Sequence, residues 1–255
     1  MKLGPCLATL CLIFTIIAGS IPLQEIAAWE EAMGSASPGV QTPDQTPPAD
    51  PDDGILADAL PTDWFYPYVQ FGYQHGFLTG ADRGFEPWRT VTRAELITML
   101  GRVHVALGGE LLGEDAPPLL YTDVAENAFY IPYLTWATER GIVQGDFEGH
   151  FRPNDPLTRE ALALILVRYV DSYGLYHYLW PHFEERGTYG DNDLISTWAR
   201  REAHLLRNWG FMHGSPGENP QPGVYFFRPG DPALRAEAAV ILVRLFGAAE
   251  EHPYD

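Results

Sequence analysis

The 255-residue chain contains a single lysine, Lys2, and its other fifteen basic residues are all arginines, lying between Arg83 and Arg244. Acidic residues outnumber basic ones by 34 to 16, which gives a formal net charge of −18. A chain of this charge repels phosphate backbones and anionic lipid headgroups. The composition therefore excludes a protein that binds nucleic acid or an acidic membrane through its bulk charge.

Cysteine is also scarce, because the only two, Cys6 and Cys11, lie in an apolar segment at the amino terminus. Lys2 precedes this segment and Ala18-Gly19-Ser20 follows it, a pattern typical of a secretory signal peptide and too short for an ordinary membrane span. We predict a signal peptide over residues 1–28, cleaved after Ser20 or Ala28; an uncleaved membrane anchor is the alternative. The exported chain then has no cysteine, so we expect no disulfide and no thiolate metal site. Once the signal peptide is cleaved, we also expect no contact with the membrane.

Residues 29–57 contain no basic residue and five prolines interspersed with Asp, Thr, Gly and Ala. Neither a helical nor a strand period is present. The composition predicts a disordered acidic, proline-rich linker. The folded part is expected to begin near Asp58, and its 46% hydrophobic content is enough for an ordinary core.

The rest of the chain contains three internal repeats, at residues 58–107, 121–170 and 189–246. In each, a glycine is preceded at twelve residues by an aromatic residue and followed at four by a second glycine. Each repeat then has Phe-x-Pro, an arginine eight residues after the Phe, and another arginine nine residues later. The sets are Trp64, Gly76, Gly80, Phe85, Arg93 and Arg102; Phe129, Gly141, Gly145, Phe151, Arg159 and Arg168; and Trp198, Gly210, Gly214, Phe227, Arg235 and Arg244.

Each repeat is predicted to form two helices. Apolar residues after the first aromatic follow a helical period, and the glycine that ends this segment suits a left-handed cap. The second helix is expected to start near Thr92, where Thr92 and Glu95 fit a capping box, near Thr158, or at an N-cap on Asp231. The second helices are apolar all round, so we predict an all-α fold in which residues 96–103, 162–169 and 238–245 are buried together.

The pattern resembles three tandem copies of the S-layer homology (SLH) domain. The motifs that carry the resemblance are Tyr121-Thr122-Asp123-Val124, Gly141-Ile142-Val143-Gln144-Gly145, Phe151-Arg152-Pro153, and the Thr-Arg-Ala-Glu sequence at residues 92–95. The second repeat has Glu160-Ala161 in place of Ala-Glu. The third has Leu234 in place of Thr and seven more residues between Gly214 and Phe227 than the second has between Gly145 and Phe151.

The resemblance implies a pseudo-threefold spindle of helices around a central three-helix bundle. It also implies an exported bacterial protein that attaches non-covalently to the cell wall, as a monomer, by binding a wall polysaccharide that often carries pyruvate ketals. Two alternatives stay open: a surface-layer component that assembles with itself, and an adaptor that recruits another exported protein through the linker.

The candidate ligand-binding residues come from equivalent positions in the three repeats. Arginine binds a carboxylate bidentately, and a helix amino terminus favours an anion, so the arginines at the helix starts are the first candidates. Ion pairing with nearby carboxylates is the competing interpretation, and for Arg102, Arg168 and Arg244 a structural role is favoured. For the tryptophans, core packing is favoured over a sugar platform. The candidates are Arg93, Arg159, Arg235, Glu95, Glu160, Glu237, Trp64, Trp198, Gly80, Gly145, Gly214, Asp58 and Asp123.

The sequence predicts no enzyme, no cofactor and no metal site. Its eight histidines form no HExxH or HxH motif, and there is no Gly-x-Ser-x-Gly sequence and no phosphate-binding loop. Carboxylates are numerous, but none is in a recognisable pair for glycoside cleavage.

Overall fold

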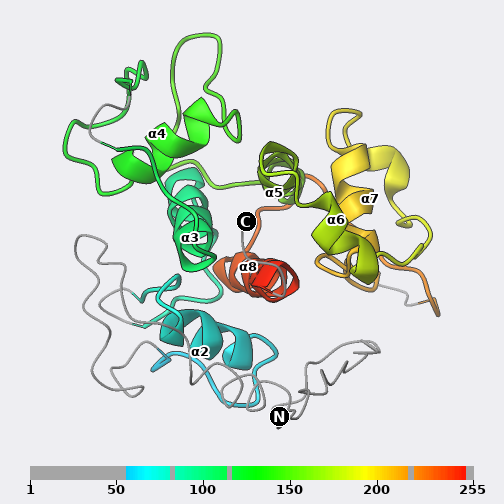
Figure 1. The fold of residues 1–255 in the computed structure, drawn as a ribbon. Coiled ribbons are helices and arrows are strands. Elements are labelled where there is room, and N and C mark those ends of the chain that lie inside the picture. Colours follow the sequence, from blue (N-terminus) through cyan, green and yellow to red (C-terminus); the bar gives the residue numbers. More distant parts are fainter. Residues whose placement is uncertain (1–55, 81–83, 114–116, 218–220, 251–255) are drawn as a thin grey trace, which may run out of the picture. The chain divides into compact units, whose positions relative to one another are not determined.

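A computed structural model of the chain describes residues 56–80, 84–113, 117–217 and 221–250 (Figure 1). The predicted signal peptide and nearly all of the predicted linker lie outside these residues. The described part contains seven α-helices and no β-sheet, which confirms the all-α prediction. The elements are α2 (Tyr66–Gln74), α3 (Arg93–Ala106), α4 (Ile131–Glu139), α5 (Arg159–Ser172), α6 (Tyr176–Leu179), α7 (Arg200–Asn208), α8 (Arg235–Glu250) and the 3₁₀-helices η1 (Trp180–His182) and η2 (Asn192–Leu194).

The helices α3, α5 and α8 lie at the centre, and α2, α4 and α7 lie outside them (Figure 1). Each outer helix packs against the central helix of the preceding repeat: α4 on α3, α7 on α5, and α2 on α8. The first helix of the first repeat therefore packs on the last helix of the third, and this contact closes the arrangement into a ring. Most of the apolar residues of α3, α5 and α8 are buried, as the sequence predicts, while Val105 and Leu164 are half-buried.

The three repeats are also joined by a closed cycle of backbone hydrogen bonds. The Val91 amide donates to the Ala233 carbonyl at 3.0 Å, Ala233 donates to Leu157 at 2.8 Å, and Leu157 donates to Val91 at 3.0 Å. Each repeat thus supplies one donor and one acceptor, and none can complete the cycle alone.

The first amides of each central helix are used in the same way. In α5, the Arg159 amide donates to the Asp231 carbonyl at 2.9 Å and the Glu160 amide donates to Pro229 at 3.2 Å. The starts of α3 and α8 make the equivalent bonds to the second and first repeats. These amides already have carbonyl acceptors within the fold. That a helix start attracts an external anion stays a prediction.

The helix caps agree with the sequence in two repeats and differ in the third. Thr92 and Glu95 form the predicted capping box, and Thr158 accepts from the Ala161 amide without a returning glutamate. The prediction of an N-cap at Asp231 is wrong, because α8 begins at Arg235. The segment before it is extended, since the Ala233 amide belongs to the backbone cycle and Leu234 pairs with Thr90.

The middle residue of each Phe-x-Pro motif is left-handed, with φ of 56° for Glu86, 58° for Arg152 and 56° for Arg228. This conformation costs a non-glycine residue roughly 1–2 kcal/mol. In every repeat an aspartate offsets this cost by accepting from the amides of the Phe and of the left-handed residue: Asp58 at 3.0 and 2.6 Å, Asp123 at 2.8 and 2.7 Å, and Asp191 at 2.7 and 2.7 Å.

A buried histidine makes the stability of this fold depend on pH. His104 is 1% exposed, and its ring stacks on that of Trp136 with centroids 5.0 Å apart. Burial lowers the pKa of His104 to about 4 from its usual 6.5. Because the folded state favours the neutral ring, its stabilisation is complete above pH 6.5 and is expected to decline as the pH falls from 6.5 towards 4.

Denaturant unfolding of the wild type and of His104→Gln at several pH values between 7 and 4 will measure this decline. We expect the variant to lose less stability over this interval than the wild type, because it has no ring to protonate. Equal losses in the two proteins would show that His104 is not responsible.

Candidate functional site

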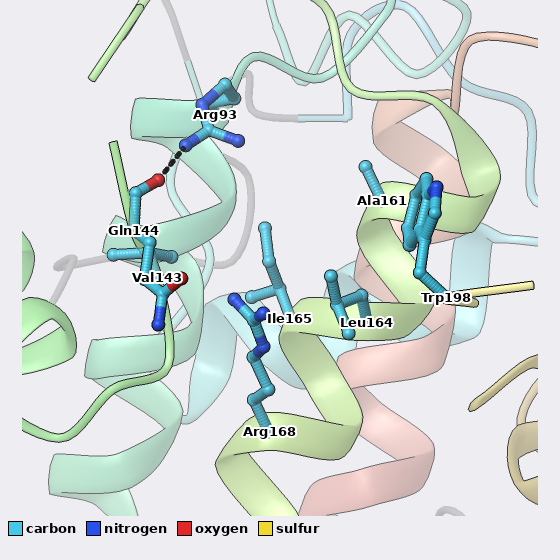
Figure 2. A pocket seen from close by; sticks show the side chains of 8 residues that line it. All are labelled: Arg93, Val143, Gln144, Ala161, Leu164, Ile165, Arg168 and Trp198. Atoms are coloured by element: carbon cyan, nitrogen blue, oxygen red, sulfur yellow. Dashed lines mark hydrogen bonds between the residues drawn. The ribbon is translucent and has the colours of Figure 1, made fainter. Parts of the chain in front are cut away.

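A pocket with a volume of about 260 Å³ lies beside α3 and α5 (Figure 2). Its walls come from the start of α3, the loop after α4, one side of α5 and the segment before α7, so all three repeats contribute. The residues that line it are Arg93, Val143, Gln144, Ala161, Leu164, Ile165, Arg168 and Trp198. We call this pocket the Arg93 groove.

Two arginines provide the charge of the Arg93 groove. Arg93 is held by the loop of the second repeat: its Nε donates to the Phe151 carbonyl at 2.8 Å and its Nη2 to the Gln144 carbonyl at 3.1 Å. Its guanidinium lies 4.8 Å from the centre of the Phe151 ring. Burial lowers the pKa of Arg93, but an arginine side chain stays charged in a protein. Within the described part of the chain, no carboxylate lies within 4.0 Å of this guanidinium.

Arg168 extends from α5 into the groove and is half-buried (Figure 2). Its guanidinium has neither a hydrogen bond nor an ion pair with any described residue. The equivalent arginines are engaged: Arg102 donates to Thr79 Oγ1 at 3.0 Å, and Arg244 donates to the Phe211 carbonyl at 3.2 Å. Arg102 and Arg244 therefore have partners that fit the structural role predicted for this position, whereas Arg168 has none among the described residues.

Arg159 and Arg235, both candidates from the sequence, are buried within the repeat interfaces. The Arg159 Nε donates to the Phe227 carbonyl at 2.7 Å, and its Nη1 pairs with Glu237. Arg235 donates to the Phe85 and Thr79 carbonyls at 2.8 and 2.7 Å and pairs with Glu95 at 3.3 Å. Exposed fractions of 8% and 7% leave little of either side chain to a ligand.

The three glutamates have two different roles. Glu95 and Glu237 accept from arginines of neighbouring repeats; burial alone would raise the pKa of Glu95, but hydrogen bonds from Arg89 and from the Thr92 amide, with the charge of Arg235, lower it. Glu160 instead accepts from the Ser196 amide at 3.1 Å and from Ser196 Oγ at 3.2 Å. It thereby fastens the segment that carries Trp198 to the start of α5.

The aromatic residues at the start of the outer helices are exposed, so the preference for placing the tryptophans in the core is wrong. Trp64 is 50% exposed, Phe129 66% and Trp198 49%. The residues that follow them take the buried positions: Phe65 is fully buried, Tyr130 is 8% exposed and Ala199 is fully buried. Of the three aromatics, Trp198 lines the Arg93 groove.

The remaining candidates shape the loops around the site. A Cβ at Gly145 would lie 2.5 Å from the Tyr121 ring and 2.8 Å from the His150 carbonyl, so the chain has room only for glycine beside Gln144. Gly214 is left-handed, with φ of 82°, and Gly80 is exposed. Asp58 and Asp123 are committed to the Phe-x-Pro turns described above. The sequence did not identify Val143 and Gln144 as site residues. Gln144 contacts Arg93 through its backbone carbonyl, which every residue type has, so its side chain gives no signal in the sequence.

Asp146, Glu148 and His150 form a group of possible metal ligands, and none of them lines the Arg93 groove. The Asp146 carboxylate already accepts from the Arg152 guanidinium at 2.8 Å and from the Glu148 and His150 amides at 2.9 Å. These hydrogen bonds hold the loop of residues 146–152 in its conformation, and they explain why the three side chains lie close together.

The fold and the groove define a helical-repeat protein in which three repeats share one core. The family model of the S-layer homology domain matches residues 56–97 and 120–163, so these two segments are S-layer homology repeats. The third repeat lies outside the matched segments, but it makes the same aspartate, arginine and backbone contacts as the other two. Family and relatives place the protein at the cell surface. Among the described residues, no helix is long and apolar enough to cross a membrane.

Several relatives are larger proteins. The chain is 30% identical over 206 residues to an endoglucanase from Bacillus sp. (strain KSM-635), covering 78% of this chain and 19% of that one. It is 30% identical over 167 residues to the exoglucanase XynX of Acetivibrio thermocellus, covering 64% and 14%. The S-layer protein sap of Bacillus anthracis is 25% identical over 191 residues, covering 72% and 20%. The chain thus spans a fifth or less of the length of these relatives.

Proposed function

We propose that this protein anchors itself non-covalently to the cell wall by binding a wall polysaccharide in the Arg93 groove. One observation carries the proposal: two guanidinium groups that have no carboxylate partner among the described residues, Arg93 and Arg168, share a pocket with the half-exposed indole of Trp198. An indole face stacks on the apolar face of a sugar ring, and a guanidinium pairs with a carboxylate through two parallel hydrogen bonds.

The size and charge of the groove fit one acidic sugar unit. Its volume of about 260 Å³ is below the roughly 300–1,000 Å³ of sites for drug-sized ligands. A pyruvate ketal places a fixed carboxylate on such a unit, and we propose that the wall polymer carries this group. The net charge of −18 does not oppose binding, because charges more than about 8 Å apart in solution are largely screened.

The same proposal treats the repeat region as a binding module without catalysis. The relatives named as an endoglucanase and an exoglucanase share only 19% and 14% of their length with this chain. Their names describe whole proteins, most of which lies outside the matched region. The arginines and the indole of the groove supply no acid–base pair for glycoside cleavage.

We expect Arg93→Ala combined with Arg168→Ala to weaken binding to purified wall polysaccharide at least tenfold, because each lost charged hydrogen bond costs about 1.5–3 kcal/mol. Arg228→Ala is the matched control, since Arg228 is an exposed arginine of the third repeat outside the groove. Calorimetry gives the affinity and circular dichroism checks the fold. A folded double variant with unchanged affinity would remove the groove from the proposal, and acid removal of ketal pyruvate from the polymer should imitate the loss.

A further inference from the structure

The repeats differ in the residue that faces the arginine at the start of each central helix. Arg159, the first residue of α5, pairs with Glu237, the third residue of α8. Arg235, the first residue of α8, pairs with Glu95, the third residue of α3. The repeats are arranged around a pseudo-threefold axis, so the equivalent pair at the remaining interface is the first residue of α3 and the third residue of α5. These residues are Arg93 and Ala161, and both line the Arg93 groove.

The other contacts show that this equivalence is structural. The Nε atoms of Arg93, Arg159 and Arg235 donate to the carbonyls of Phe151, Phe227 and Phe85, at 2.8, 2.7 and 2.8 Å. The three arginines therefore enter their interfaces in the same way, and the missing carboxylate at residue 161 is what distinguishes the first interface.

The exchange of Ala and Glu in the second repeat has a second consequence. The glutamate is retained one residue earlier, as Glu160, where it accepts from Ser196 instead of pairing with Arg93. The exchange therefore leaves Arg93 without a carboxylate partner among the residues that the structure describes. It also ties the segment bearing Trp198 to the rim of the same groove.

We propose that Ala161 determines anion specificity by leaving the Arg93 groove as the anion-accepting one of the three equivalent interfaces, while Glu95 and Glu237 occupy the arginines of the other two. This inference rests on the proposed function and deepens it, since it assigns one acidic group of the polymer to each chain. In the Arg93 groove, the carboxylate of the sugar takes the place that Glu237 and Glu95 occupy beside the arginines of the other two interfaces.

The test restores the carboxylate. The probe is the methyl glycoside of N-acetylmannosamine bearing a pyruvate ketal, compared by calorimetry with the same glycoside without the ketal. We expect the full wild-type chain to bind one ketal sugar, and Ala161→Glu to bind it at least about tenfold more weakly, because the new carboxylate competes for Arg93. Ala161→Gln is the steric control and should stay within about threefold of the wild type.

Sedimentation with isolated wall sacculi separates this inference from the proposed function. If the wild type and a folded Ala161→Glu variant bind ketal sugar and sacculi equally well, wall anchoring stands and the role of residue 161 is refuted. Three ketal sugars per chain, or wild-type binding to sacculi without binding to the ketal sugar, would refute it as well. A wild type that binds neither would overturn both.

Discussion

Phe71→Ala is expected to lower the free energy of unfolding of the whole repeat region by about 3–5 kcal/mol, the usual cost of truncating a buried Phe. Phe71 is 1% exposed on α2, and its ring lies 5.8 Å from that of Phe246 on α8 and 6.4 Å from that of Phe77. The cavity would therefore form at the contact between the first and the last helix of the ring.

This position makes Phe71 a test of cooperativity. In an open array of repeats, damage to a terminal helix loosens that end and leaves the rest folded. Here α2 covers α8 and the backbone cycle passes through every repeat, so opening this contact should release all three central helices together. We expect one unfolding transition, shifted as a whole.

Trp136→Ala provides the comparison, because Trp136 is fully buried in the outer helix of the second repeat. Both variants should unfold in a single transition in denaturant, followed by circular dichroism and by tryptophan fluorescence. Phe147→Ala, at a fully exposed residue, should leave the transition unchanged. Two separate transitions for Phe71→Ala would mean that the first repeat unfolds independently.

Local patterns explain what the sequence could predict of the fold. The recurring spacings locate the repeats, and the capping box at Thr92 and the left-handed glycines at residues 76, 141 and 210 are set by neighbouring residues. The partner of each outer helix is not local. That α2 packs on α8 depends on closure of the ring, a property of all three repeats together.

The site shows the same division more sharply. The sequence singled out the arginines at the helix starts but could not rank them, because their partners lie far along the chain. Arg159 and Glu237 are 78 residues apart, and Arg235 and Glu95 are 140 residues apart. The exchange at residues 160 and 161 was visible as a departure from the motif. Its effect on Arg93 needed the arrangement that brings Ala161 to that groove.

Arg159→Ala is expected to destabilise the fold by about 3 kcal/mol, because it removes one partner of a largely buried ion pair. Glu237 would lose its arginine, and the Phe227 carbonyl would lose the donor that now lies 2.7 Å away. Since the two side chains act as a pair, Arg159→Ala combined with Glu237→Ala should cost less than the sum of the single changes. Thermal unfolding of the three variants measures this coupling.

Arg168→Ala should have the opposite profile, with an unchanged unfolding midpoint and weaker binding to wall polysaccharide. The reason is that Arg168 has no hydrogen bond or ion pair to lose among the described residues and extends into the groove. Position along α5 would predict the reverse order, with Arg159 at the helix start as the ligand and Arg168 packed in the bundle. If folded Arg159→Ala loses binding while Arg168→Ala retains it, then Arg159 contacts the ligand despite its burial, and the Arg93 groove is not the binding site.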